Sequence, residues 1–593
     1  MDRQNPSGVV FPFRASAESG ISFELNSNGS IRRMDHGDIM LNLFPGNEVE
    51  GGPANIHLRL RGDESAAHPL LGPGSGSSIE ALGDGLRVKG EWRGLVYQVW
   101  LRLAKSLPAW FWHVEIVNTT DRVFTVDLIH SQDIGLAHYG AIRLNEFYVS
   151  QYVDHTPLEH PRAGWAVASR QNQSMGGRFP WSVIGSLGKA VSYSTDALQF
   201  HGLSNRAGNG AEGLLSGLPG KRLQHEHSLV GIQSEEMTLA PGAGKTCGFF
   251  GGFNPDHPNA TEDFDAGWID GLLALPEAAP PDWNAPSSGH PAAETLFSRA
   301  SQLDSLELTD DEIRGFFGAE TRHMESGDGG VWSFFTGENQ HVVFKAKENA
   351  VLRPHGMILR SGGVLTADES LLTSTCWMNG VFHSMVTQGH VSINRFLSTC
   401  HSYLGLFRSH GQRVFVKLDG AWCLLGLPSA FEMAPDRCRW IYKHAGGIIE
   451  VISEAPSSRN ELSLEIRHLT DAPLPVLISH HVAMNGDDGN APHPVVREDR
   501  EGGIFVRAIP DSDVGRRFPD GGFLVRPADG TVFETAGGDE LLFRDGVSRG
   551  QPFLCVLTKP APRVGLTIVG RLVDDQDQHD AEFWKNIPAG LRI

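Results

Sequence analysis

The sequence predicts a mainly β protein built from two antiparallel sandwich lobes with a short helical linker between them. Short apolar stretches separated by turn residues recur along most of the 593 residues. The 69 glycines and 34 prolines are spread along the chain, which suits many short strands joined by tight turns. A proline-dense stretch at 278–286 divides two β-rich halves, and a chain of this length has room for several domains.

The first half contains the clearest strands. Residues 110–116 alternate in polarity as a half-buried strand does, residues 118–121 carry turn residues, and residues 123–129 give a second strand. Residues 86–88 and 97–103 follow the same pattern. A succession of such strand–turn–strand units predicts an antiparallel sandwich.

Two helices are predicted after the prolines, within a linker that packs on a sheet. The first begins at Pro291 and places four apolar residues at helical spacing, namely Leu296, Phe297, Ala300 and Leu303. The second begins at Thr309, where Glu312 completes a capping box. In that motif each side chain satisfies a backbone N–H group at the start of the helix.

Strand-like sequence resumes at about residue 330 and repeats part of the first half. Residues 464–480 align without gaps to residues 114–130, with six of the 17 positions identical and a Thr-Asp turn in the same place. The match favours duplication of one sandwich architecture. The alternative is that strand–turn–strand units resemble one another in any β protein.

Charge and composition exclude several classes of function. A formal net charge of -20 opposes binding to nucleic acid or to an anionic membrane, because both require a basic face. No apolar run approaches the roughly 20 residues of a membrane helix, and no signal-like segment follows Met1, so we expect a cytoplasmic protein. The six cysteines form no C-x-x-C pair, which predicts free thiols in a reducing compartment. We expect no metal and no cofactor.

The densest group of sugar-binding residue types lies at 143–156. Aromatic faces stack on the C–H surfaces of sugars, while amides and carboxylates bond to hydroxyl groups. The candidates in this segment and in the nearby 170–173 segment are Asn145, Glu146, Tyr148, Gln151, Tyr152, Asp154, His155, Arg170 and Asn172. The alternative is a long structured loop whose polar groups satisfy its own backbone.

A second group with a similar mixture lies in the second half. Its members are Trp377, Asn379, His383, Asn394 and Arg395, which could contact a glycan. The favoured alternative is a buried polar network between two sheets.

Glycoside cleavage usually needs two opposed carboxyl groups, or one acid with an external nucleophile such as phosphate. Glu146 and Asp154 are the two carboxylates of the 143–156 segment. Their spacing alone does not place them across a scissile bond. We predict no catalysis by this chain alone.

Three segments resemble the N-terminal region of glycoside hydrolase family 94, in particular its long 1,2-β-oligoglucan phosphorylase type. They are residues 145–157, residues 170–173 and the run from Gly337 to Gly411. Related sandwich lobes occur in cyclic β-1,2-glucan synthases. The resemblance spans most of residues 20–590. It implies galactose mutarotase-like β-supersandwich lobes and helical linkers, followed by an (α/α)6 barrel and a small C-terminal β domain.

The resemblance also implies an activity and partners. Members of this family cleave β-glucosidic bonds with inorganic phosphate and invert the anomeric carbon, which gives α-glucose 1-phosphate. Their general acid and phosphate site lie in the barrel, which we expect to be missing here, so no catalytic residue is carried over. The implied partners are a β-glucan oligosaccharide, phosphate through the missing barrel, and either a second copy or a barrel-containing polypeptide.

The expected boundaries are 15–277 and 329–575 for the two sandwich domains, 278–328 for the linker between them, and 576–593 for the start of a linker towards the barrel. The apolar end at 583–593 is typical of a cut inside a longer protein. Two other functions stay open. One is a free-standing glucan-binding or dimerisation module, and the other is a sandwich hydrolase that uses Glu146 and Asp154 as its acids.

Overall fold

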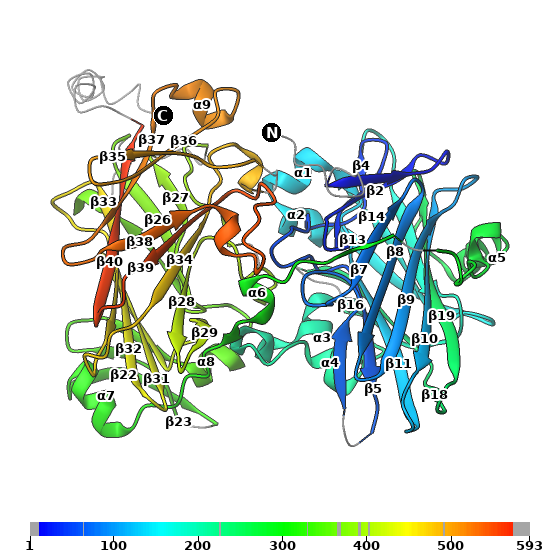
Figure 1. Cartoon of the computed structure of the whole chain (residues 1–593), viewed down its shortest axis with the longest axis horizontal. Coiled ribbons are helices and arrows are strands. Elements are labelled where there is room, and N and C mark those ends of the chain that lie inside the picture. The colour runs from blue at the N-terminus through cyan, green and yellow to red at the C-terminus, as the bar shows by residue number, and fades with distance from the viewer. Residues whose placement is uncertain are drawn as a thin grey trace. The chain divides into compact units, whose positions relative to one another are not determined.

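The computed structural model describes residues 11–62, 65–223, 227–286, 288–328, 330–363, 369–389, 393–400, 404–489 and 493–572. Strands make up 47% of the chain and helices 13%, which confirms the predicted mainly β class. The chain divides into two compact units, coloured blue to green and green to red in Figure 1. The segment 576–593, for which a linker is predicted, lies outside the described residues.

The two units meet along the sequence at Arg299 and Ala300. Unit 1 also takes in Phe543–Asp545, and unit 2 also takes in Arg206–Gly208. The division falls inside the expected linker 278–328, so the residues of that segment are shared between the units.

Unit 1 contains one large, mostly antiparallel sheet and one small sheet. The large sheet contains, in pairing order, β20 (His290–Pro291), β7 (Ser78–Leu82), β8 (Gly85–Trp92), β9 (Leu95–Leu103), β10 (Ala109–Asn118), β19 (Gly244–Asn254), β15 (Trp181–Ser186), β14 (Gly164–Gln171), β16 (Ala190–Asp196), β17 (Ser228–Ser234), β11 (Phe124–Asp133), β5 (Asn55–Leu60) and β6 (Ala66–Pro69). Beside this path lie β13 (Val153–His160), which pairs with β14, and β18 (Met237–Leu239), which pairs with β11. The small sheet contains β1 (Phe13–Ser16), β2 (Ile21–Leu25), β3 (Ile31–His36), β4 (Ile39–Met40) and β12 (Ala137–His138).

The α-helices described in unit 1 are short. They are α1 (Tyr139–Leu144), α2 (Glu146–Gln151), α3 (Ala197–His201), α4 (Glu212–Ser216), α5 (Gly267–Leu273) and α6 (Leu296–Arg299).

Unit 2 contains three sheets. The largest contains β22 (Thr321–Gly327), β23 (Gly330–Thr336), β24 (His341–Phe344), β30 (Ala430–Ala434), β31 (Arg437–His444), β32 (Gly447–Glu454), β33 (Glu461–His468), β40 (Arg563–Arg571), β37 (Gly522–Pro527), β36 (Gly503–Arg507) and β35 (Val496–Arg500). The second contains β21 (Ser301–Gln302), β29 (Ala421–Leu424), β28 (Gln412–Leu418), β34 (Val476–His481), β39 (Phe553–Thr558) and β38 (Phe533–Gly537). The third contains β25 (Gly356–Arg360), β26 (Leu372–Trp377) and β27 (Val381–Gln388), and the described α-helices are α7 (Asp310–Phe317), α8 (Lys345–Ala350) and α9 (Asp513–Arg517).

Strand β10 shows how the predicted strands fit the core. It is a strand as predicted, but Trp110, Phe111 and Trp112 are all buried, so the expectation of a half-buried strand was wrong. Successive side chains of a strand point to opposite faces, which means that both faces of β10 are covered. Pairing with β19 sets Trp110 opposite Gly251. A Cβ atom on Gly251 would lie 2.1 Å from the Trp110 ring, so this glycine leaves the room that the indole occupies.

The expected linker contains one of its two predicted helices and a short part of the other. Helix α7 begins after Thr309, whose hydroxyl accepts the Glu312 N–H at 3.3 Å while the Glu312 carboxylate accepts the Thr309 N–H at 2.6 Å. The other predicted helix forms only at Leu296–Arg299, as α6, because Pro291 belongs to β20 and the chain continues after α6 into β21. Leu303 N then donates to Leu424 O at 2.8 Å. The four apolar side chains at helical spacing are buried all the same, so burial in an irregular segment produced the helical pattern.

The two units repeat one order of strands. The order β8-β9-β10-β19 of unit 1 corresponds to β31-β32-β33-β40 of unit 2. Likewise β5-β11-β17 corresponds to β28-β34-β39. The aligned residues 114–130 lie on β10 and β11, and residues 464–480 lie on β33 and β34. Shared connectivity therefore supports the predicted duplication.

The turn inside each repeat is held in the same way. The Asn118 Oδ1 atom accepts the backbone N–H of Thr120 at 2.9 Å. At the equivalent position of unit 2, the His468 Nδ1 atom accepts the backbone N–H of Thr470 at 3.4 Å. A side chain two residues before the threonine thus closes both turns, although its chemical type differs.

Candidate functional site

The predicted 143–156 segment of unit 1 is not a loop. It forms the end of α1, then α2, then the start of β13. Asn145 lies between the two helices with an extended backbone, and its Oδ1 atom accepts the Tyr148 N–H at 3.0 Å. Asn145 is therefore the N-cap that starts α2, which is a favoured position for this residue type.

Two tyrosines of this segment form an exposed aromatic pair. Tyr148 is 46% exposed and Tyr152 is 38% exposed, and their ring centroids lie 4.9 Å apart with the planes at 61°. The Tyr152 hydroxyl donates to the Tyr148 oxygen at 3.1 Å, and this hydrogen bond raises the pKa of Tyr152. Gln151 is exposed beside them. We call Tyr148 and Tyr152 the tyrosine pair; it offers a flat apolar surface with hydroxyl groups at its edge.

Asn172 is the exposed neighbour of the tyrosine pair. Its backbone N–H donates to Tyr152 O at 2.8 Å, and its side-chain oxygen accepts from Arg170. Arg170 is 8% exposed and donates to His257 O at 2.8 Å and to Pro258 O at 2.9 Å. The guanidinium is thus occupied inside the unit, where it orients Asn172.

The remaining predicted residues of unit 1 lie mostly below the surface. Glu146 is 7% exposed and His155 is 1% exposed. The ring nitrogens of His155 are hydrogen-bonded to Ser169 Oγ at 2.8 Å and to Ser228 Oγ at 3.0 Å, and burial lowers the pKa of His155 to about 4. Asp154 accepts from Arg222 at 2.6 Å. Glu146 and His155 therefore support the fold from inside the unit, whereas Asp154 forms an ion pair with Arg222 at the surface.

The predicted group in unit 2 also contains both buried and partly accessible side chains. His383 and Asn394 are buried, with His383 bonded to Ser374 Oγ at 2.9 Å and to Ser463 O at 3.0 Å. They belong to a polar network inside the unit, which was the favoured alternative. Trp377, Asn379 and Arg395 are half-buried, and these three keep part of their surface accessible.

Local packing fixes Trp377 and Asn379. The Trp377 carbonyl accepts the Trp440 indole N–H at 3.1 Å, and a Cβ atom on Gly356 would lie 2.5 Å from the Trp377 ring. The Asn379 carbonyl accepts from Arg413 at 3.0 Å. These contacts fix the backbone at Trp377 and Asn379. A fixed backbone is compatible with a binding surface and also with a purely structural role.

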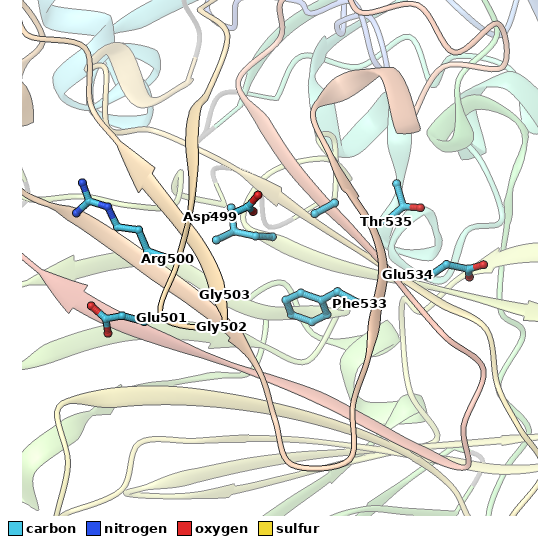
Figure 2. Close-up of a pocket in the computed structure, with 10 residues that line it drawn as sticks. Asp499, Arg500, Glu501, Gly502, Gly503, Phe533, Glu534 and Thr535 are labelled. Carbon is cyan, nitrogen blue, oxygen red and sulfur yellow. The ribbon is translucent and has the colours of Figure 1, made fainter.

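Sequence reasoning missed a cavity in unit 2. It lies between the hairpin β35–β36 and strand β38 and has a volume of about 430 Å³ (Figure 2). Its walls are about 30 residues apart in the sequence, at the edges of two different sheets, and no motif marks them. The pairing that brings such edges together is not local, so periodicity could not find it.

The described residues offer no obvious metal centre. Among them, no group of three or more His, Cys, Asp or Glu side chains is placed to hold a metal ion. Within the same residues, no helix combines the length and apolar character needed to cross a membrane.

Comparison with known proteins gives matches over both units. Residues 24–251 match the SOGP N-terminal domain, and residues 319–568 match the glycoside phosphorylase supersandwich domain. A 1,2-β-oligoglucan phosphorylase of Listeria innocua serovar 6a is 26% identical over 523 residues, which cover 87% of this chain. The same alignment covers 45% of that relative, so the chain spans about half of its length.

Similarity to solved structures is weak. A polysaccharide lyase gives a TM-score of 0.29 at 8% identity, covering 77% of this chain and 45% of that one. A galactose mutarotase related enzyme from Lactobacillus acidophilus gives 0.23 at 9% identity, covering 42% of this chain and 99% of that one. Scores of this size carry no functional argument. The two domain matches, by contrast, lie in consecutive units of one chain, which therefore resembles glycoside phosphorylases in an SOGP N-terminal domain and in a supersandwich domain.

Proposed function

We propose that this chain is the carbohydrate-binding sandwich half of an inverting β-glucan phosphorylase that acts on 1,2-β-oligoglucans. A catalytic barrel on further polypeptide would bind inorganic phosphate and supply the general acid, and α-glucose 1-phosphate would be released there. The observation that carries the proposal is the pair of domain matches in sequence order, together with the long alignment to a 1,2-β-oligoglucan phosphorylase.

The surface of unit 1 supports a contact with sugar. The tyrosine pair provides a stacking surface, and Asn172 provides an amide that can both donate to and accept from hydroxyl groups. The buried Arg170 and His155 are bonded on several sides, which keeps this surface rigid. A rigid surface loses less conformational entropy when it binds a ligand.

A catalytic role inside unit 1 has less support. Glu146 is buried, and Asp154 is paired with Arg222. A general acid needs access to the scissile oxygen, and an attacking base needs access to water. We therefore assign no catalytic residue to this chain and propose that its contribution to turnover is to bind and position the glucan.

Calorimetric titration with sophorose-type and cellobiose-type oligosaccharides tests the binding role. We expect saturable binding with preference for the β-1,2 linkage and no formation of glucose 1-phosphate by the chain alone. Adding a barrel polypeptide should restore phosphorolysis. Cleavage or synthesis of a glycosidic bond by residues 1–593 alone would contradict the proposal, as would the absence of binding to either series.

A dimerisation module is the second candidate, and one observation favours it. Leu144, the last residue of α1, is 87% exposed, and α2 with the tyrosine pair follows it directly in the sequence. Exposed apolar groups of this kind often mark protein contacts. Light scattering of Leu144→Ser beside the native chain tests this: a shift from dimer to monomer favours the second candidate.

The six free cysteines support a reducing compartment, and we propose a cytoplasmic location. Fractionation of the source cells, with detection of the chain by antibody, checks this expectation.

A further inference from the structure

The cavity of unit 2 lies where two sheet edges approach each other. One wall is the hairpin β35–β36 and the other is β38. The lining residues are Asp499, Arg500, Glu501, Gly502, Gly503, Ile504, Phe533, Glu534, Thr535 and Ala536. Its volume of about 430 Å³ falls within the roughly 300–1,000 Å³ that is typical of small-molecule sites.

Each wall includes an edge strand, which carries backbone groups outside the sheet. Strand β35 ends the eleven-stranded sheet and pairs with β36 alone, whereas β38 ends the six-stranded sheet and pairs with β39 alone. Each therefore carries N–H and C=O groups that the sheet does not use. These groups can bond to a polar ligand placed between the walls.

Part of the lining is apolar. Ile504 is 5% exposed, and Phe533 is half-buried with one side packed against the main core of the unit. Figure 2 shows the Phe533 ring between the hairpin and β38, with Asp499 above it. The cavity thus offers an aromatic surface with one carboxylate beside it.

The other charged residues are occupied or point elsewhere. Arg500 pairs with Glu498 at 2.7 Å and its guanidinium lies 4.4 Å from the Phe505 centroid, while Glu501 pairs with Arg571 at 3.0 Å. In Figure 2 these two side chains point away from the cavity on one side, and Glu534 points away on the other. Asp499 makes no ion pair with any residue that the structure describes, which leaves its carboxylate as the charged group facing the cavity.

We propose that this cavity binds one ring of a neutral saccharide. The C–H face of a pyranose would stack on Phe533, its hydroxyls would donate to the Asp499 carboxylate, and the strand edges would bond to the remaining hydroxyls. A phosphate or carboxylate ligand is disfavoured, because Asp499 would repel it. This is a binding site in unit 2, made of residues that share none with the tyrosine pair of unit 1.

A peptide strand is the competing occupant, and two features oppose it. Strand β35 carries Arg497, Glu498, Asp499 and Arg500 in succession, and charged edges discourage the addition of another strand. The pairing of β38 is interrupted by a register shift between Phe533 and Thr535, which breaks the regular spacing that an added strand needs. A compact ligand meets neither obstacle.

The choice of β-glucosides as probes rests on the proposed function, whereas the cavity itself does not. Methyl β-glucoside and sophorose are titrated into the full chain and followed by saturation-transfer NMR and calorimetry. Phe533→Ala removes the stacking surface and Asp499→Asn removes the charge, and each should weaken binding at this site about tenfold. The matched control is Asp419→Asn, which changes an exposed carboxylate in the turn between β28 and β29, outside the lining, and should leave affinity within about twofold.

Phe533 also contacts the core, so a second variant protects the test against misfolding. Ala536 is exposed, and Ala536→Phe fills the cavity without removing any packed side chain. It should abolish the same binding event while the thermal midpoint stays unchanged. In a chain that also carries Tyr152→Ala, binding that survives both Ala536→Phe and Asp499→Asn overturns the proposal.

The outcomes separate this inference from the proposed function. If Tyr152→Ala abolishes all saccharide binding and Ala536→Phe abolishes none, the cavity proposal fails while the role of unit 1 stands. If neither probe binds the native chain, both proposals fail. If a basic peptide binds and Ala536→Phe prevents it while sugars do not bind, the cavity is a peptide site and the saccharide proposal is wrong.

Discussion

The two units share a strand order but handle buried polar side chains differently. In unit 1 burial lowers the pKa of six described histidines to between about 3 and about 4, namely His57, His113, His130, His155, His201 and His227. Among the described histidines of unit 2, burial lowers the pKa of His480 to a similar extent, to about 4. The interior of unit 1 therefore contains several neutral imidazoles. Unit 2 shares the strand order without as many of them, so this strand order does not require them.

The equivalent residues His130 and His480 show where the difference arises. His480 is hydrogen-bonded to Leu554 O and to Gln412 Nε2, both at 3.0 Å. His130 stacks on Phe249 at 5.2 Å, and its Nδ1 atom has no hydrogen-bond partner within the described part of the chain. The histidine and its burial are common to the two units, but its hydrogen-bond partners differ. The strand arrangement is therefore more similar between the units than the polar contacts inside it.

Acidification should give the largest difference in stability between the two units. A histidine with a lowered folded pKa stabilises the fold fully above about pH 6.5, the ordinary pKa of histidine, and that contribution is lost as the pH falls towards the folded pKa. Each such group costs about 1.4 kcal/mol for every pH unit below 6.5, and unit 1 has six. Hydrogen exchange at pH 5 should show unit 1 opening first.

The carboxyl group of Asp133 acts in the opposite sense. Burial raises the pKa of Asp133 in unit 1 to about 6, so its folded form gains a proton before the unfolded form does and offsets part of the loss between pH 6 and pH 4. Equal protection of both units from hydrogen exchange at pH 5 would contradict this prediction, because it would mean that water reaches the histidines of unit 1 in the folded state.

Breaking a buried ion pair should have the next largest effect. Asp127 accepts from Arg59 Nε at 2.8 Å and from Gln233 at 2.9 Å, and Arg59 and Asp127 are both fully buried. Asp127→Ala leaves an unpaired charge and should lower the free energy of unfolding of unit 1 by about 3–5 kcal/mol. Urea titration with a probe in each unit measures it.

The matched change in unit 2 is Glu450→Ala. Glu450 accepts from Arg439 at 2.6 Å, but Arg439 also pairs with Glu432 at 3.2 Å and keeps that partner. We expect a smaller loss, about 1–2 kcal/mol. If Glu450→Ala lowers the free energy of unfolding as much as Asp127→Ala does, then Glu432 does not stabilise Arg439 in the absence of Glu450.

The cap of α7 gives an effect confined to unit 2. Thr309→Ala removes the side chain that accepts the Glu312 N–H and should lower the stability of unit 2 by about 1 kcal/mol. Thr309→Ser keeps the hydroxyl and serves as the control. Destabilisation of unit 1 by the alanine variant would show that the two units unfold together.

The tyrosine pair should show the smallest effect on stability. Tyr148→Ala removes an exposed ring and should change the free energy of unfolding by less than about 0.5 kcal/mol. Sugar affinity should fall about three- to tenfold, because stacking is lost. Leu215→Ala, at an exposed apolar residue on α4 of the same unit, is the control and should change neither quantity.

Local chemistry decided what could be predicted from sequence. The strands β9 and β10 and the cap of α7 depend on neighbouring residues, and their patterns predicted them. The burial of Trp112 depends on elements distant in sequence, so alternation suggested a half-buried strand. Glu146 and His155 have the residue types of a sugar site, yet packing placed them inside, and residue type alone cannot reveal burial.

The contact between Trp110 and Gly251 has a consequence for the descent of this protein. Neither residue can be replaced alone without loss: a larger residue at 251 would collide with the indole, and a smaller one at 110 would leave a void above the glycine. We therefore expect the two positions to change together. A lineage that exchanged the tryptophan for a smaller ring would be expected to acquire a methyl group on the opposite strand, and the history of one position could be inferred from the other.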